Sequence, residues 1–399
     1  MWKINKYTIT FDTDGGSTID SITQDYGTEI VKPNDPTKEG YTFIGWDKEI
    51  PSTMPAESIT IKALWKINKY TITFDTDGGS TIDSITQDYG TRVTLPTPTK
   101  AGYKFVGWIY NNKFISEKSI LLKNDIKFTA YWIDENLEFS INKDYETLTI
   151  TGCSNKSITS IIIPDRATTI GNSAFYNCTS LTSITIPNSV TTIGSGAFSD
   201  CTSLENVYYE GTIEDWCNIK FSYFSSNPMR YAKHFYMLNS NNEYEEVTSI
   251  EIPDTLTIIG DYQFYGFNNV TSITIPNSVT AIGNGAFSGC TSLISATLQN
   301  GITTIGKDAF CDCTSLTSIT IPNSVTTIGE DAFYNCISLE NVYYEGTIED
   351  WCNIKFSYFS SNPMRYANHF YMLNVDNEYE EVTSIEIPDT VTNIGDYQF

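Results

Sequence analysis

Two different patterns of apolar and polar residues divide the chain. In the first third, apolar and polar positions alternate over short runs such as Tyr7–Asp12 and Tyr70–Asp75, which is typical of half-buried strands. From Ile158 onward the pattern L-x-x-I-x-I-P recurs instead, mostly in steps of 23 residues. The alternation predicts separate β modules, and the fixed short period predicts the stacked coils of a solenoid.

Two copies of one β module, at 1–66 and 67–133, form the first part of the chain. Trp2–Thr28 recurs letter for letter as Trp65–Thr91. Each copy opens with an alternating strand and then carries Asp-Gly-Gly, which predicts a tight hairpin turn because these residues accept positive φ. Repetition on this scale predicts an extended scaffold rather than one large globular domain.

The later part of each module also repeats. The blocks GYTFIGW (40–46) and GYKFVGW (102–108) predict aromatic strands that fill a small core, and an apolar strand closes each module at Ala63–Trp65 or Ala130–Trp132. Together with the Asp-Gly-Gly turn, these motifs resemble the Listeria–Bacteroides repeat over nearly all of 1–133. That resemblance implies a small β-grasp-like module of bacterial surface proteins, used as a spacer or a weak binder.

A hairpin cap and a leucine-rich solenoid are expected after the modules, at 134–152 and 153–399. Residues 137–151 predict the hairpin, which would cover the first coil of the stack. Within one coil, inward positions are expected to alternate on a short strand, continue on a return path and end on a short helical turn at Ala197–Phe198. The apolar set of that coil is Leu181, Ile184, Ile186, Val190, Ile193, Ala197, Phe198 and Cys201.

The coil pattern resembles a known repeat family. The sequence I-P-x-x-V-x-x-I-G-x-x-A-F recurs through 150–399 and is similar to the BspA-like leucine-rich repeat. The resemblance implies an extracellular or cell-surface protein that adheres to host or matrix proteins, or to other cells. The fold class predicted for the whole chain is mainly β, with two β-grasp-like modules followed by a repeat solenoid with short helical inserts.

Two longer steps in the solenoid carry inserts, near 210–246 and 345–381. Thr212, followed by acidic residues, predicts a capped helix start, and Pro228 predicts a second one. Phe235–Glu246 predicts a hairpin. The second insert repeats the first almost without change, so whatever the insert does is expected to occur twice.

Charge separates the two parts of the chain and excludes one class of partner. Residues 1–133 carry 15 Lys/Arg against 16 Asp/Glu, whereas residues 134–399 carry 9 against 32. Clustered basic residues are what binding to a nucleic acid backbone requires, so no nucleic acid partner is expected. The sequence contains no apolar run of about 18 residues, so no membrane span is predicted. Met1 and Phe399 both align with positions inside repeats, which favours a fragment whose signal and anchor lie elsewhere.

The repeats explain most of the residues that could otherwise suggest catalysis or metal binding. Five cysteines share one coil position and are expected to pack as small apolar residues, with disulfides or metal binding as less favoured alternatives; they are Cys178, Cys201, Cys290, Cys313 and Cys336. His234 and His369 are one position copied twice. Glu210, Glu214 and Asp215 fit the charge of a helix N-terminus. We therefore predict no catalytic residue, no cofactor and no metal site.

Two surfaces remain as candidate binding sites. The outward strand positions form hydroxyl rows, at Ser183, Thr185, Ser272, Thr274, Ser318 and Thr320. The inserts contribute aromatic residues that could anchor a protein or stack on sugars, at Tyr209, Tyr223, Phe224 and Tyr231. For the hydroxyl rows, the competing interpretation is a soluble sheet face without a ligand. For the insert aromatics, it is a small hydrophobic core within the insert.

These observations predict a monomeric, non-enzymatic adhesion protein that contacts a host or matrix protein along an extended surface. Binding of a cell-surface glycan, as a module of a larger surface enzyme, is one alternative, and a purely structural stalk is another. The function rests on the family resemblance, because repeat physics alone predicts only a scaffold.

Overall fold

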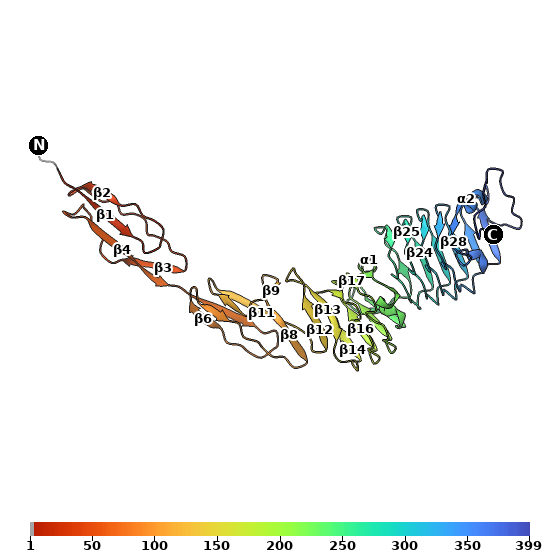
Figure 1. Cartoon of the computed structure of the whole chain (residues 1–399), viewed down its shortest axis with the longest axis horizontal. Helices are drawn as coiled ribbons and strands as arrows, with labels where there is room; N and C mark the ends of the chain where they lie inside the picture. Colours follow the sequence, from red (N-terminus) through yellow and green to blue (C-terminus); the bar gives the residue numbers. More distant parts are fainter. Residues whose placement is uncertain (1–3) are drawn as a thin grey trace. The chain divides into compact units, whose positions relative to one another are not determined.

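The computed structural model describes residues 4–399, and Met1–Lys3, the start of the first predicted module, lie outside the described residues. The chain separates into two compact units that meet between Trp132 and Ile133. The first unit contains the two β modules and the second contains the solenoid (Figure 1). The mainly β fold class predicted from the sequence is confirmed.

Each module is a small mixed sheet with a parallel central pair. In the first module the strand order is β2-β1-β4-β3, and β1 pairs with β4 in parallel. In the second the order is β6-β5-β11-β8-β9, with β5 parallel to β11 and a separate β10-β7 ribbon. The strands are β1 (Lys6–Asp12), β2 (Ile22–Asp25), β3 (Tyr41–Trp46), β4 (Ile59–Ile67), β5 (Lys69–Asp75), β6 (Ile85–Asp88), β7 (Arg92–Thr94), β8 (Tyr103–Tyr110), β9 (Lys113–Phe114), β10 (Ser119–Leu121) and β11 (Ile126–Asp134).

The modules have separate cores. Ile9, Phe11 and Ile61 are buried at the centre of the first, and Ile72 and Phe128 are buried at the centre of the second. Because each module buries apolar side chains of its own, its fold does not depend on stacking against another repeat.

The Asp-Gly-Gly segment packs against a tryptophan side chain and does not form the predicted tight hairpin turn. Asp14 and Gly15 do have positive φ, of 48° and 82°. However, β1 pairs with β2 through Ile9 and Ile22, so a long connection separates the strands and the hairpin prediction is wrong. The indole nitrogen of Trp65 donates to Thr13 O over 3.0 Å. A side chain at Gly16 would come within 2.6 Å of that indole, so glycine is required there for close approach.

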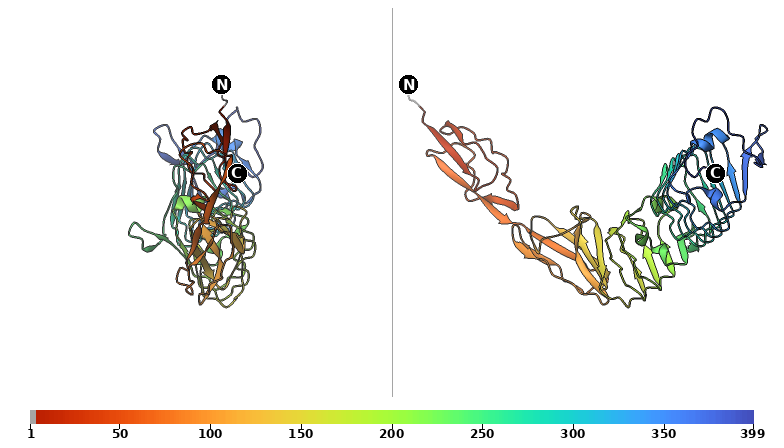
Figure 2. Two further views of the ribbon diagram at one scale, coloured as in Figure 1. Left: turned by 90° about the vertical axis from the view of Figure 1, so that its left-hand side faces the viewer. Right: turned by 45° about the vertical axis from the view of Figure 1, so that its right-hand side comes forward.

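The solenoid begins with an antiparallel hairpin, β12 (Leu137–Ile141) and β13 (Leu148–Cys153). From there each coil contributes one strand to a front sheet and one to a rear sheet, and strands of successive coils pair in parallel (Figure 2). In the coil that begins at Leu181, the front strand is β16 (Ser183–Ile186) and the rear strand is β17 (Thr192–Ile193).

The first insert divides each of these sheets into two blocks. The first front sheet has the order β14-β16-β18-β20-β21 and the second has β22-β24-β26-β28-β30-β32-β33. Their remaining strands are β14 (Ser160–Ile162), β18 (Asn206–Tyr209), β20 (His234–Leu238), β21 (Tyr244–Glu246), β22 (Ile250–Glu251), β24 (Ser272–Ile275), β26 (Ser295–Leu298), β28 (Ser318–Ile321), β30 (Asn341–Tyr344), β32 (His369–Leu373) and β33 (Tyr379–Glu381).

The rear sheets are interrupted in the same way. Their orders are β12-β13-β15-β17-β19 and β23-β25-β27-β29-β31. The remaining strands are β15 (Ala167–Ile170), β19 (Lys220–Phe221), β23 (Ile258–Ile259), β25 (Ala281–Ile282), β27 (Thr304–Ile305), β29 (Thr327–Ile328) and β31 (Lys355–Phe356). The first insert therefore ends one stack of coils, and another stack starts after it.

The turn side of each coil is irregular, so the helical turn predicted at Ala197–Phe198 is wrong. Residues 195–200 form successive turns. The amide of Phe175 donates to Ala197 O of the next coil over 2.8 Å, which leaves these groups unavailable for bonds within a helix. The buried rings of Phe175 and Phe198 stack with centroids 5.4 Å apart, and the same stack recurs between Phe310 and Phe333 at 5.5 Å.

The inserts contain the only helices among residues 4–399. They are α1 (Ile213–Cys217), α2 (Ile348–Asn353) and the short 3-10 turns η1 (Phe224–Ser226), η2 (Pro228–Arg230) and η3 (Pro363–Arg365). Thr212 caps α1 as predicted and forms a reciprocal capping box with Asp215. Pro228 begins η2 with Asn227 as its cap, which confirms the second predicted helix start as a 3-10 turn.

Candidate functional site

The hydroxyl rows lie on the outward face of the front sheets. Along β14, β16 and β18, Ser183 pairs in register with Asn206, and Thr185 pairs with Tyr208. The other four predicted residues (Ser272, Thr274, Ser318 and Thr320) lie on the second front sheet, where β26 separates β24 from β28. The structure thus places the six residues in two groups. Their inward neighbours, such as Ile184 and Ile319, are buried.

Each hydroxyl row ends in a cluster of tyrosines that the sequence analysis did not select. In the first insert the rings of Tyr208 and Tyr236 stack at 5.0 Å, and Tyr244 meets Tyr208 edge-on at 4.8 Å. Thr320 pairs with Tyr343 just as Thr185 pairs with Tyr208. We call these two sets the tyrosine clusters: Tyr208, Tyr236 and Tyr244, and their copies Tyr343, Tyr371 and Tyr379.

Carboxylates surround the first tyrosine cluster. The hydroxyl of Tyr244 donates to Glu210 over 3.3 Å, and His234 Nδ1 lies 2.6 Å from Glu246 Oε1. Burial, followed by the charge of Glu210, raises the pKa of Tyr244 to about 12, so this phenol is a neutral hydrogen-bond donor near pH 7. Asn269, from the following coil, donates to Glu246 and so joins the cluster to the second front sheet.

The second cluster repeats this arrangement. Tyr379 donates to Glu345 over 3.1 Å, and His369 Nδ1 lies 2.6 Å from Glu381 Oε1. The two clusters therefore present the same rings and the same acids, 135 residues apart in the sequence.

The four predicted insert aromatics do not form one surface, and the prediction that Tyr209 is a surface residue is wrong. Tyr209 is fully buried, with its ring 5.2 Å from that of Trp216, so it belongs to the insert core and cannot contact a ligand. Tyr231 is half-buried, and its hydroxyl accepts a hydrogen bond from the amide of Asp200 over 3.2 Å. That bond gives Tyr231 a role in tying the insert to the preceding coil.

Tyr223 and Phe224 line a pocket of about 250 Å³, which we call the aromatic pocket. Two further rings, Tyr262 and Tyr265, come from the coil after the insert. The remaining lining residues are Gly285, Ser288, Asp308 and Cys311. The structure thus combines two predicted residues with two rings that were not selected from the sequence.

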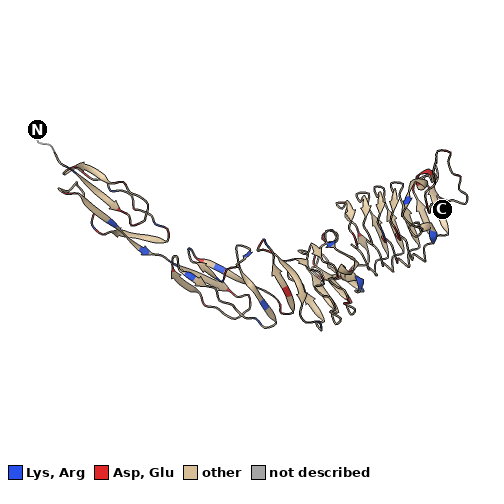
Figure 3. Cartoon of the chain, in the orientation of Figure 1, with Lys and Arg blue, Asp and Glu red and all other residues tan. Residues whose placement is uncertain are grey.

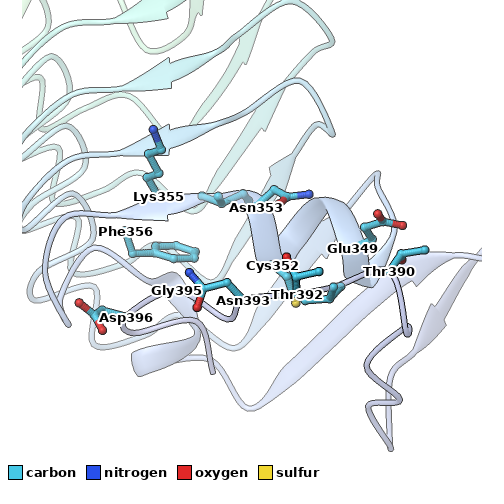
Figure 4. Close-up of a pocket in the computed structure, with 12 residues that line it drawn as sticks. Glu349, Cys352, Asn353, Lys355, Phe356, Thr390, Thr392, Asn393, Gly395 and Asp396 are labelled. Atoms are coloured by element: carbon cyan, nitrogen blue, oxygen red, sulfur yellow. The ribbon is translucent and has the colours of Figure 1, made fainter.

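A second pocket, of about 350 Å³, lies between the second insert and residues 390–396 (Figure 4). Glu349 of α2 and Asp396 of the last coil lie at its edges. At the corresponding place in the first insert, Thr255 donates to Glu214 over 2.9 Å and strand β23 is formed. The pocket therefore marks a coil that is less regular than its counterpart, and its lining shows no convergent chemistry.

The nine cysteines are free, and eight are buried. Cys201 Sγ donates to Phe175 O over 3.1 Å, and Cys313 and Cys336 make the same contact to the preceding coil at 3.2 Å. Burial raises the pKa of Cys201 and of Cys336 to about 12, which makes their thiols unreactive near pH 7. Across residues 4–399 no three His, Cys, Asp or Glu side chains gather as metal ligands.

The second unit is acidic, and few of its charges are paired. Lys233 contacts Glu205 and Lys307 contacts Glu330, at 3.2 and 2.6 Å. Figure 3 shows how few basic residues lie along the coils. A negative potential of this kind favours cationic groups and basic partners. In the described part of the chain, no helix has the length and apolar character needed to cross a bilayer.

Family models match most of the chain. The model described as "BspA type Leucine rich repeat region" matches residues 146–243 and 238–362 in six copies. The model described as "Listeria-Bacteroides repeat domain" matches residues 7–63 and 70–131. Both resemblances expected from the sequence motifs are therefore confirmed.

Individual relatives share only segments with this chain. Internalin H of Listeria monocytogenes is 46% identical over 112 residues, which is 26% of this chain and 20% of that protein. A "Putative Gly-rich membrane protein" of Evansella cellulosilytica is 33% identical over 145 residues, which is 33% of this chain and 17% of that protein. The chain thus spans about a fifth of the length of these curated relatives.

Solved structures show similarity as well. A Treponema pallidum leucine-rich repeat protein has a TM-score of 0.30 at 24% identity, covering 52% of this chain and 79% of its own. A leucine-rich cell surface protein of Faecalibacterium prausnitzii has a TM-score of 0.25 at 23% identity, covering 56% of this chain and 96% of its own.

Proposed function

Because the chain belongs to the BspA type leucine-rich repeat family and carries two Listeria–Bacteroides repeats, we propose that it is a cell-surface protein that binds a host or matrix protein along its front sheets. The tyrosine clusters anchor the partner, and the hydroxyl rows that end in them supply broad polar contact. No chemical step is involved. The modules at 1–66 and 67–133 act as spacers before the binding solenoid.

The observation that carries this proposal is the exact recurrence of the clusters. Tyr208 and Tyr343 extend the rows of Thr185 and Thr320 in register, and each stands beside the same acidic and tyrosine neighbours. Tyrosine is enriched among residues that dominate binding energy at protein interfaces. Two equal anchors in one compact unit allow bivalent contact, which raises avidity without any new kind of contact.

Ring geometry favours a protein partner over a glycan. Sugars stack on open ring faces, but Tyr208 and Tyr236 stack on each other with planes 18° apart. Each of these two rings therefore has one face covered by the other, and ring edges suit edge contacts with side chains. The glycan alternative and the purely structural stalk remain as outcomes of the test.

The test is a binding screen against purified matrix proteins and a glycan array, using the intact chain and the double variant Tyr208→Ala/Tyr343→Ala. We expect saturable binding to a matrix protein, weakened about tenfold or more in the variant, because loss of a hot-spot anchor costs about 2 kcal/mol. The matched control is Tyr176→Ala/Tyr334→Ala, which removes tyrosines that are 50% and 46% exposed on the turn side.

Three results would contradict the proposal. Equal weakening in the variant and the control would remove the clusters from the interface. Binding only to glycans would favour the lectin-like alternative, and no binding at all would favour a structural stalk.

A further inference from the structure

The aromatic pocket lies on the turn side of the solenoid, where an insert meets the next coil. Tyr223 and Phe224 come from the insert, and Tyr262 and Tyr265 come from the coil that follows. The Tyr223 and Tyr262 rings are 5.8 Å apart, as are the Phe224 and Tyr265 rings. Tyr262 also meets Tyr265 edge-on at 6.4 Å. Four rings from two different repeats therefore converge on one small space.

Tyr262 occupies a coil position where other coils carry small or acidic residues. In the coils without an insert that position has a positive φ, for example 53°, 65° and 56° at Ser173, Gly196 and Asp308. Tyr262 has a φ of 57°, a backbone conformation that is unfavourable for a residue with a bulky side chain. The chain nevertheless places tyrosine there in both coils that follow an insert, at Tyr262 and Tyr397.

The next coil makes room for this ring. A β-carbon at Gly285 would lie 2.7 Å from the Tyr262 ring, so a larger residue there would displace the tyrosine. The pocket therefore depends on a matched pair, with a tyrosine in one coil and a glycine in the next. Such matching shows that the pocket follows from the specific residues of these coils and not from the repeat pattern alone.

The charge around the pocket is negative. Asp308 is the one carboxyl group in its lining. The ammonium of Lys307 lies 2.6 Å from Glu330, outside the pocket lining. Arg230 places its guanidinium 4.4 Å from the Phe224 ring centre, which shows that this ring already accepts a cation, although Arg230 does not line the pocket. Ring faces beside a carboxylate select cations over neutral or anionic groups.

We propose that the aromatic pocket binds a quaternary ammonium group, held by the faces of Tyr262, Tyr265 and Tyr223 and by the carboxylate of Asp308. The methyl groups of such a cation contact the rings, and its spread charge interacts with the ring electrons without the hydration that a primary ammonium carries. This site is separate from the tyrosine clusters, and it adds a small-molecule or headgroup ligand to a protein-binding surface.

The test is titration of the intact chain with tetramethylammonium, choline and the neutral isostere 3,3-dimethylbutan-1-ol, followed by NMR or calorimetry. We expect both cations to bind saturably and the neutral isostere to bind at least tenfold more weakly. Tyr262→Ser installs the residue that the chain itself uses at Ser173, and it should weaken cation binding about tenfold or more. Asp308→Asn should weaken it severalfold.

The control is Tyr334→Ser, which removes an exposed tyrosine from the turn of another coil. It should leave cation binding unchanged. Equal affinity for the neutral isostere, or unchanged binding in Tyr262→Ser, would overturn the proposal. Far-UV circular dichroism of each variant shows whether a loss reflects unfolding. Arms with phosphocholine and with a trimethyl-lysine peptide distinguish a headgroup from a modified protein as the source of the cation. Matrix-protein binding by Tyr262→Ser tests the two proposals independently.

Discussion

The two inserts have almost the same sequence but different surroundings. Leu204–Asn239 and Leu339–Asn374 differ only at Lys233 and Asn368. In the sequence, the coils of 247–338 follow the first insert, and residues 375–399 follow the second. Within each insert most hydrogen bonds recur, including the capping boxes of α1 and α2. The η1 turn and the bond from Asn218 Nδ2 to Glu214 O occur in the first insert without a counterpart in the second.

The coils that follow the inserts are not the same. Ile259 is fully buried in β23, whereas its counterpart Ile394 is 48% exposed and lies outside any strand. Phe264 is fully buried, but Phe399 is 58% exposed. The comparison teaches that an insert carries its own local structure, whereas a coil owes its regularity to the coils that pack against it.

The largest test of this comparison concerns the tryptophan at the centre of each insert. Both indole nitrogens donate to the following coil, at Gln263 O and Gln398 O. The ring of Trp216 also packs against Phe267 of that coil, whereas the aromatic partners of Trp351 belong to its own insert. We expect Trp216→Ala to lower the free energy of unfolding by about 3–5 kcal/mol. Trp351→Ala should cost less by about 1 kcal/mol, because one aromatic contact fewer is lost.

Urea unfolding followed by far-UV circular dichroism gives the two losses, and hydrogen exchange locates them. Exchange should rise on both sides of the first insert in Trp216→Ala, and only within 339–399 in Trp351→Ala. Equal losses with equal spread would contradict the view that surroundings separate the two copies.

A smaller test concerns the helix caps. Thr212 and Thr347 each accept from the amide of the aspartate three residues later, over 3.1 Å in both copies. Replacing either threonine by alanine should cost about 1 kcal/mol. Because the cap is local, the two variants should raise exchange in α1 and in α2 equally. A clearly larger effect in one copy would show that the surroundings reach the helix.

The smallest test makes the two inserts identical. Lys233 contacts Glu205 at 3.2 Å, but both side chains are more than half exposed. Lys233→Asn should therefore change the free energy of unfolding by less than about 0.5 kcal/mol. A larger loss that disappears in high salt would mean that the one sequence difference, and not the surroundings, separates the copies.

Much of the fold follows from periodicity. The spacing of Leu181, Ile184 and Ile186 predicts inward positions that are indeed buried, because each coil must cover the next. The same repeat register already indicates that Tyr209 points inward. Counting from Leu204, Val207 and Tyr209 take the places of Ile184 and Ile186, which leaves Tyr208 outward beside Thr185. The first cluster was therefore predictable in part.

Other features depend on contacts between distant segments. The positive φ of Asp14 was predicted, but its purpose was not, because Trp65 reaches this turn from the far end of the module. The aromatic pocket likewise needs the path of the insert over the following coil, which places Tyr223 beside Tyr262. Local patterns do not encode such encounters.

The parallel pair at the centre of each module has a mechanical consequence. In the first module, β1 is its first strand and β4 its last, and they are bonded side by side from Ile9 with Ile59 to Asp12 with Lys62. Tension applied along the chain pulls these two strands in opposite directions along their length. The hydrogen bonds between them are then loaded together in shear, and the module resists extension until they yield as a group. In the solenoid, tension on a terminal coil instead loads its ladder from one end, so coils peel away one after another.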